Sequence, residues 1–166
     1  MWMLLWFAAM PFADDMAEKK VIPNSVFFSE VEDRISEGKR VVIPVKGGSM
    51  LPFIREGRDS VELAPCTDVE VGEILLVKLD NGHYVLHRVW ELRGESVILM
   101  GDGNVKGKEV CKRGQVVGVV SRIFRGEGVI DCASPSYRRC VKIWRGLLPI
   151  RRYILAIYRR LIKLGL

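Results

Sequence analysis

The sequence has few of the residues that build metal sites, and it lacks the spacing that such sites need. It contains only two histidines, His83 and His87, and four cysteines. No Cys-x-x-Cys pair is present, which excludes the common zinc-finger modules. The cysteines are Cys66, Cys111, Cys132 and Cys140. They could form disulfides, but a chain of 166 residues needs no such cross-link, so we expect free thiols and leave the compartment open.

Long hydrophobic runs are also missing. Residues 1–13 are apolar and rich in tryptophan, but they are too few to span a bilayer and no basic residue precedes them. A marginal anchor, a weak signal peptide and an upstream start codon are the alternatives for this segment, and we favour the last two over the anchor. Internal repeats and low-complexity tracts are absent as well.

Acidic residues are absent from Cys132 to the end of the chain, where nine of the 26 basic residues lie. The net charge of +6 therefore belongs to the C-terminal tail. Apolar residues of this tail recur at helical spacing, namely Ile150, Tyr153, Ile154, Ile157, Leu161 and Leu164. An apolar stripe beside arginines fits a lipid surface better than nucleic acid. We expect residues 138–166 to contact an anionic membrane peripherally; the alternatives are a helix that packs on the domain and a cytoplasmic location.

The rest of the chain is typical of a folded, mainly β domain, with 49% hydrophobic and 28% charged residues. A helix is predicted from Asn24 to Gly38, and short apolar segments separated by turn residues predict strands. The predicted strands are residues 41–45, 60–64, 74–79, 83–92, 96–100 and 115–124, and we expect the first of them to be a buried strand. They favour a coiled, partly closed antiparallel sheet. We divide the chain into an extension (1–20), a domain with its leading helix (21–130) and a basic helical tail (131–166).

A serine loop follows the first predicted strand and reads Lys-Gly-Gly-Ser-Met-Leu-Pro from Lys46. Gly47 and Gly48 permit backbone angles that let a loop bring its amides close to a ligand. The proline stiffens the exit, so Ser49 is presented by a loop of fixed shape. On these residues alone, a plain Gly-Gly-Ser turn is the favoured interpretation, because loops are rich in these residue types.

The motifs that follow the serine loop have a characteristic order. They are Gly-Arg-Asp (57–59), Val-Gly-Glu (71–73) before an apolar strand, Leu-His-Arg (86–88), Gly-Asp-Gly-Asn (101–104) and Val-Val-Gly-Val-Val (116–120). In order and spacing, residues 41–125 resemble the catalytic domain of the signal peptidase I clan, which includes the SOS-repressor autoproteases. This resemblance implies the sheet fold of that clan and a serine peptidase activity.

The resemblance implies three catalytic residues. Ser49 matches the nucleophile, and His87 stands where most members carry a lysine base. With histidine at this position, the chain resembles the branch of the clan that contains the endoplasmic-reticulum, archaeal and sporulation-type signal peptidases. An imidazole titrates near neutral pH and can act as base and then as acid. Asp102 matches the residue that would orient His87.

Alternatives remain open for the last two residues. A lone strand histidine is often structural, and His83 shares a strand face with His87, which permits a metal site. Asp102 could form an ordinary Asx turn. The histidine branch carries a further aspartate about six residues later, where this chain has Lys108 and Glu109. Asp102 could therefore act alone, act with Glu109, or serve as a structural clamp.

The resemblance also assigns the oxyanion and substrate loop. The backbone amide of Ser49 is the expected oxyanion donor. Gly47 offers only an amide where many relatives have a hydroxyl. Met50 is expected to pack under the loop and to line the substrate groove.

The function predicted from the sequence is a Ser-His endopeptidase that cleaves an extended segment after a small residue and so matures a dedicated peptide or protein substrate. It needs no cofactor or metal, and we expect no nucleic-acid partner. The alternative is a degenerate member of the clan whose sheet binds a peptide or another partner without cleaving it.

Overall fold

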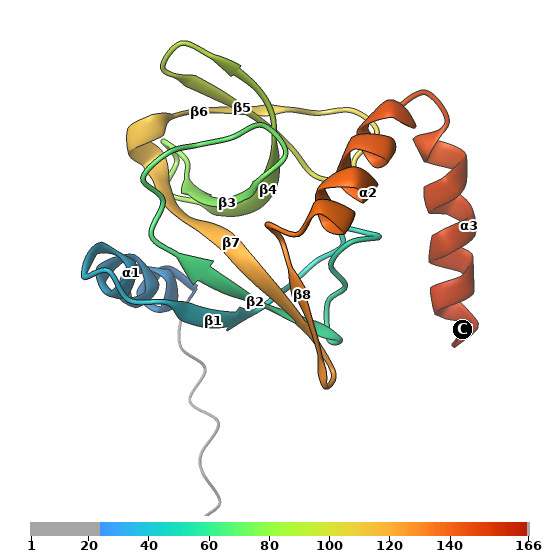
Figure 1. The fold of residues 1–166 in the computed structure, drawn as a ribbon, viewed down its shortest axis with the longest axis horizontal. Coiled ribbons are helices and arrows are strands. Elements are labelled where there is room, and N and C mark those ends of the chain that lie inside the picture. The colour runs from blue at the N-terminus through green and yellow to red at the C-terminus, as the bar shows by residue number, and fades with distance from the viewer. Residues whose placement is uncertain (1–23, 166) are drawn as a thin grey trace, which may run out of the picture.

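The computed structural model describes residues 24–165 as a curled antiparallel sheet with three helices around it (Figure 1). The strands are β1 (Val41–Pro44), β2 (Asp59–Ala64), β3 (Ile74–Lys78), β4 (Tyr84–Arg93), β5 (Ser96–Met100), β6 (Glu109–Lys112), β7 (Val116–Arg125) and β8 (Gly128–Asp131). The helices are α1 (Asn24–Ser36), α2 (Pro135–Gly146) and α3 (Arg151–Lys163), with a 3-10 turn at Arg113–Gln115. The apolar segment 1–13 and the predicted extension 1–20 lie outside the described residues.

The sheet has the strand order β1-β2-β7-β3-β4-β5-β6, and β8 pairs with β7. Each pairing is antiparallel. Register shifts interrupt the pairing of β7 with β2 and β3, and that of β4 with β5. Such irregularities bend strands and increase their twist, which lets one sheet curl into an open barrel. The predicted mainly β, coiled antiparallel sheet is confirmed.

The described residues form two large apolar clusters in the interior, and a smaller third cluster joins α3 to α2 and the serine loop. Of the large clusters, one lies between α1, α2 and the strands β1, β2, β3 and β7, and the other lies inside the curl of β3, β4 and β5. Helix α1 buries Val31 and Ile35 in the first cluster. The prediction of a buried strand at 41–45 is wrong in part, because Ile43 and Val45 are buried but Val42 is exposed. Within residues 24–165 strand β1 pairs only with β2 and packs one face, so its side chains alternate between core and solvent.

Strand β6 was not predicted from the sequence. Its residues Glu-Val-Cys-Lys bury only Cys111, so the segment has no hydrophobic run that marks a strand. The segment is a strand because it continues the sheet beside β5. Strand β8 lies beyond the last of the strands named above and pairs with β7. All four cysteines are free thiols, as expected.

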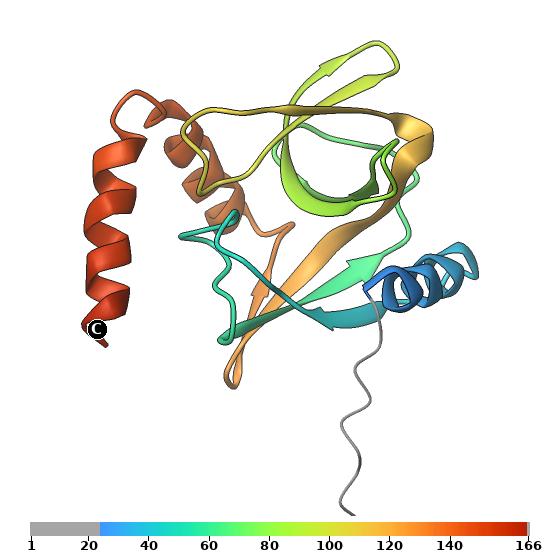
Figure 2. The same ribbon diagram turned by 180° about the vertical axis from the view of Figure 1, so that it is seen from behind.

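The predicted helical tail forms two helices, α2 and α3, separated by a turn at Pro149. The side chain of Ser134 caps α2 by accepting a hydrogen bond from the backbone N–H of Tyr137. Tyr137 and Val141 belong to the same apolar cluster as the sheet, so α2 is part of the domain core. Helix α3 lies outside α2 at the edge of the molecule, as the views from front and back both show (Figures 1 and 2).

Candidate active site

The serine loop connects β1 to a short helical turn. Gly47 adopts a left-handed backbone conformation with φ of 83°, which glycine accepts without strain. The backbone N–H of Ile54 donates to the Met50 carbonyl at 2.9 Å, and both side chains are fully buried in the core. Met50 and Ile54 thus anchor the loop from below, while Ser49 stays partly exposed at its top.

The Gly-Asp-Gly-Asn loop lies directly against the serine loop. The N–H of Gly103 donates to the carbonyl of Ser49 at 2.7 Å. A Cβ at Gly101 would lie 2.5 Å from the Ser49 carbonyl oxygen, and one at Gly103 would lie 2.4 Å from that of Gly48. The two backbones touch, so only glycine fits at these positions. The serine loop and the Gly-Asp-Gly-Asn motif, which are distant in the sequence, are therefore in contact.

Strand β4 carries His87 and Arg88, whose side chains point to opposite faces of the sheet, as predicted from strand alternation. The Nδ1 atom of His87 lies 2.8 Å from Oε2 of Glu109 in β6. A carboxylate accepts a hydrogen bond from Nδ1–H, so the neutral imidazole keeps its proton on Nδ1 and leaves Nε2 unprotonated and able to act as a base. The side chain of His87 is 8% exposed and that of Glu109 is 31% exposed. Glu109 therefore holds the ring from the solvent side.

Ser49 and His87 line the same cavity, which has a volume of about 400 Å³. Its walls are mostly apolar and come from α1, β1, β3, β4 and the serine loop, including Phe27, Phe28, Ile43, Met50, Tyr84 and Leu86. Lys46 also lines it and has an exposed side chain. No hydrogen bond joins Ser49 Oγ to His87 among residues 24–165, and catalytic hydrogen bonds are often long before substrate binds. The cavity thus joins a presented hydroxyl, an oriented imidazole and an apolar surface.

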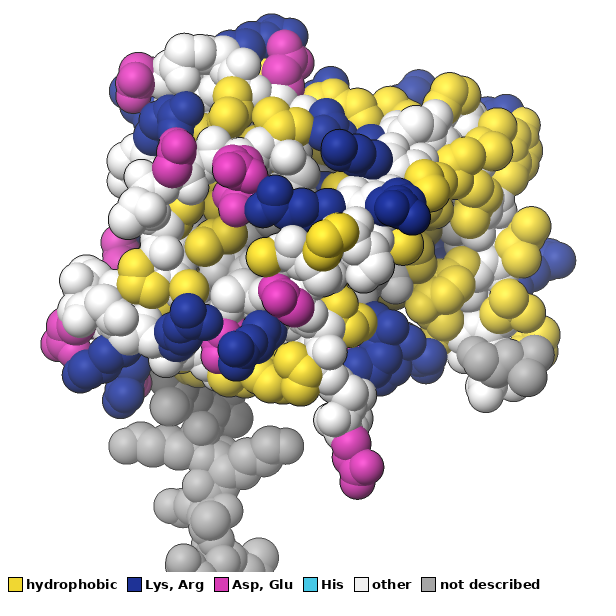
Figure 3. All heavy atoms as spheres, in the orientation of Figure 1, with side chains coloured by type: hydrophobic (Ala, Val, Ile, Leu, Met, Phe, Trp, Pro, Cys, Tyr) yellow, Lys and Arg dark blue, Asp and Glu magenta, His cyan; other side chains and the backbone are white. Residues whose placement is uncertain are grey.

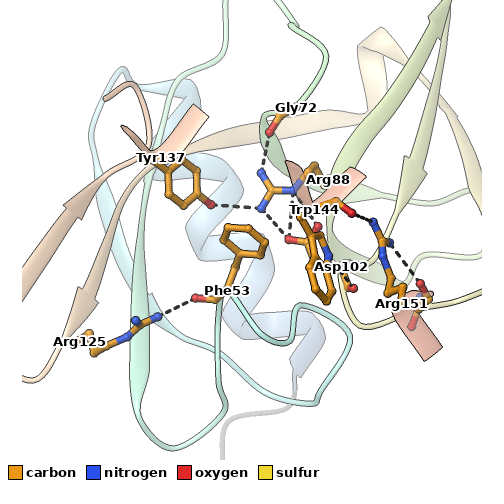
Figure 4. A network of polar contacts seen from close by, with 9 residues as sticks. Phe53, Gly72, Arg88, Asp102, Arg125, Tyr137, Trp144 and Arg151 are labelled. Carbon is orange, nitrogen blue, oxygen red and sulfur yellow. Dashed lines mark hydrogen bonds and ion pairs between the residues drawn. The ribbon is translucent and has the colours of Figure 1, made fainter. Parts of the chain in front are cut away.

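Arg88 and Asp102 form a buried ion pair on the other face of β4 (Figure 4). Arg88 donates from Nε to Oδ1 at 2.8 Å and from Nη2 to Oδ2 at 2.6 Å. Its remaining donors reach the Gly72 carbonyl and the Tyr137 hydroxyl. Burial lowers the pKa of the Arg88 guanidinium, but the charge and hydrogen bonds of Asp102 outweigh burial and raise this pKa overall. The pair is a fixed charged clamp.

The structure differs here from the expectation that Asp102 lies beside the ring of His87. The Asp102 carboxylate is engaged by Arg88, and Glu109 occupies the position next to Nδ1 of His87. The reason is electrostatic: a carboxylate that is 2% exposed needs a cation beside it, and Arg88 supplies this cation on the face opposite to His87. Of the alternatives left open by the sequence, the structural clamp describes the contacts of Asp102.

The tail helices hold the Asp102 loop from outside. Trp144 in α2 donates from Nε1 to the Asp102 carbonyl at 3.2 Å. Arg151, at the start of α3, is 1% exposed and donates to the carbonyls of Asn104 and Trp144 (Figure 4). Sequence reasoning missed Arg88 and Trp144 as supports of the site. A charged residue in the middle of an apolar strand was the available signal, because a buried arginine needs a partner.

The metal interpretation of the two histidines has no support in the geometry. His83 is exposed beside the hairpin tip, whereas His87 is buried and contacts Glu109. Within residues 24–165, no group of three or more histidine, cysteine, aspartate or glutamate side chains is arranged to bind a metal ion. The Ser49 hydroxyl and the His87 imidazole line the same cavity.

Comparison of the chain with protein-family models and with curated proteins returns no match. The function is therefore inferred from the residues and their geometry.

Proposed function

We propose that this protein is a serine endopeptidase of the signal peptidase-like clan, with Ser49 as nucleophile and His87 as general base. The observation that carries the proposal is that Ser49 and His87 line one cavity, with Nδ1 of His87 held by Glu109. The motif order in the sequence and the curled antiparallel sheet are both compatible with that clan. Asp102 serves as a positioning residue in this proposal.

In the proposed mechanism one imidazole acts first as base and then as acid in each of two half-reactions. Ser49 Oγ attacks the scissile carbonyl while Nε2 of His87 takes the hydroxyl proton. The C–N bond then breaks, and His87 gives the proton to the leaving amine. Water attacks the resulting ester with His87 again as base, which releases the acid and restores Ser49. Glu109 keeps the ring in the required tautomer and stabilises its charged form.

The backbone amide of Ser49 is the proposed oxyanion donor. Among the described residues it donates to no backbone acceptor, whereas the Ser49 carbonyl is bound by Gly103. An N–H already fixed in place stabilises a developing oxyanion without reorganisation at the moment of reaction. The contact between the two loops thus fixes both the nucleophile and this donor.

The edge of β1 favours an extended substrate. Within the described residues β1 pairs only with β2, and its residues Ile43 and Pro44 line the cavity. A peptide can add to such an edge as another strand, with its side chains in the apolar cavity. This edge equally supports the second candidate function, a module that binds a peptide without cleaving it. A test of the reactivity of Ser49 distinguishes the two functions.

A fluorophosphonate probe separates the two candidates. It reacts only with a serine whose hydroxyl is activated, so we expect one covalent adduct, which peptide mapping by mass spectrometry places on Ser49. The variant His87→Gln should lose this labelling, while His83→Gln, which alters the exposed histidine, should keep it. Absence of an adduct on Ser49 in the folded protein would favour the peptide-binding module.

Glu109→Gln is expected to reduce peptide cleavage by about 10- to 100-fold. A buried orienting carboxylate can contribute about 10⁴-fold, but Glu109 is partly exposed and water can replace some of its effect. The measurement is kcat/KM on a cleavable peptide, with Glu127→Gln, an exposed residue of the β7–β8 turn, as matched control. Unchanged cleavage in Glu109→Gln would show that this contact does not orient the base.

A further inference from the structure

Helix α3 has two apolar faces, and the domain covers only one of them. Leu155 is 1% exposed and packs against Leu51 and Trp144, with Ile154, Tyr158 and Ile162 beside it. The other face presents five apolar side chains that are 41% to 74% exposed. This outer stripe consists of Ile150, Tyr153, Ile157, Leu161 and Leu164. Packing on the domain therefore explains one face of the helix and leaves the outer stripe unexplained.

We propose that the outer stripe of α3 is a docking surface for an anionic membrane. Hydrophobic side chains gather over α3 on the surface of the molecule, at the side where this helix stands in Figure 1 (Figure 3). Ile143 of α2 is also exposed, so the neighbouring helix contributes a further apolar side chain. Scattered exposed leucines need no explanation, but a continuous exposed apolar patch marks an interaction site.

The charges beside the outer stripe identify the partner. Arg152, Arg160 and Lys163 are exposed, and none of them forms an ion pair within residues 24–165. The whole segment from Cys132 onward contains no acidic residue. An apolar stripe flanked by uncompensated cations matches the boundary between acyl chains and anionic headgroups.

A second copy of this chain fits the outer stripe less well. Two stripes packed together would bring Arg152, Arg160 and Lys163 of both copies close to one another, with no carboxylate on either tail to separate the charges. Like charges at an interface oppose association. Lipid phosphates have the opposite sign, and they are present at high density on an anionic bilayer.

The membrane contact is a surface contact. None of the helices in the described part of the chain is long and apolar enough to cross a bilayer. Helix α3 instead lies in the interface, with the outer stripe toward lipid and Leu155 toward the domain. The inner face of this helix touches Leu51, and Arg159 donates to the Gly103 carbonyl, so docking brings the serine loop and its supporting loop to the lipid surface.

Vesicle co-sedimentation of the full chain tests the proposal. Vesicles are made of phosphatidylcholine alone or of phosphatidylcholine with phosphatidylglycerol, and we expect binding to the anionic vesicles that weakens as salt is added. The double variant Ile157→Glu/Leu161→Glu should lose binding. Arg160→Gln/Lys163→Gln should weaken it by at least about tenfold. The matched control Val110→Glu/Val129→Glu changes equally exposed apolar residues on β6 and β8 and should bind like the parent protein.

Three outcomes would overturn the proposal. One is equal binding to both kinds of vesicle, and another is binding that persists in both α3 variants, which would place the lipid contact elsewhere. The third is a dimer in light scattering that Ile157→Glu/Leu161→Glu abolishes, which would assign the stripe to a second copy. Unchanged thermal unfolding of the variants shows that the fold is intact. Fluorophosphonate labelling of Ser49 does not depend on this result, so the two proposals can fail separately.

Discussion

Replacement of Ser49 by alanine should reduce peptide cleavage by at least about 10⁴-fold, because the variant has no nucleophile and only binding and the oxyanion donor remain. The free energy of unfolding should change by less than about 0.5 kcal/mol, since Ser49 is partly exposed and its hydroxyl bonds to no other described residue. The measurement is single-turnover cleavage of a peptide, together with urea-induced unfolding of the same preparation.

Ser29→Ala is the matched control for this experiment. Ser29 is exposed on α1, and its removal should leave cleavage unchanged. Cleavage by the Ser49→Ala variant at the rate of the parent protein would remove the proposed function. A folded Ser49→Ala variant that still binds the peptide would also provide the complex needed to define the cleavage site.

Arg88→Met should destabilise the protein by about 3–5 kcal/mol, the usual cost of leaving one member of a buried ion pair without its partner. The Asp102 carboxylate would lose three hydrogen bonds, and the Gly72 carbonyl would lose its donor from Arg88. For a domain of this size, Tm should fall by about 10 °C. Cleavage should fall as well, because Asp102 lies between the two glycines that pack against the serine loop.

An exposed ion pair on the same strand provides the control for Arg88→Met. Arg93 and Glu91 lie on β4 with their charges in solvent, and such pairs contribute about 0–1 kcal/mol. Arg93→Met should therefore unfold with the Tm of the parent protein. Equal and small effects of both substitutions would show that the Arg88–Asp102 pair does not hold the site together.

The secondary structure could largely be read from the sequence because its signals are local. Short apolar segments and the turn residues that separate them predict strands β2 to β5 and β7 close to where they lie. Strand β6 has no such signal, since it exists only through its pairing with β5. The exposure of Val42 likewise depends on β1 being an edge strand, which is a property of the sheet order.

The candidate site also combines features that follow from local sequence with features that only the tertiary structure determines. The residue types near Ser49 and His87, the two glycines of the 101–104 loop and the two faces of β4 all follow from local sequence, because loop chemistry and strand alternation are short-range properties. Local sequence does not determine which carboxylate contacts His87 and which contacts Arg88. Asp102 and Glu109 are both plausible partners of an imidazole, and only the curl of the sheet places Glu109 beside His87 and Asp102 beside Arg88.

The tail shows the same division between sequence and tertiary structure. The sequence itself contains the helical spacing and lacks acidic residues here, which is enough to predict that α3 is an amphipathic, basic helix. The sequence alone does not determine which apolar side chains of α3 meet the domain. Leu155 fits against Leu51 and Trp144, and this contact turns the outer stripe to solvent. Helix propensity and charge are properties of neighbouring residues, whereas the choice of the buried face depends on the shape of a surface built from distant parts of the chain.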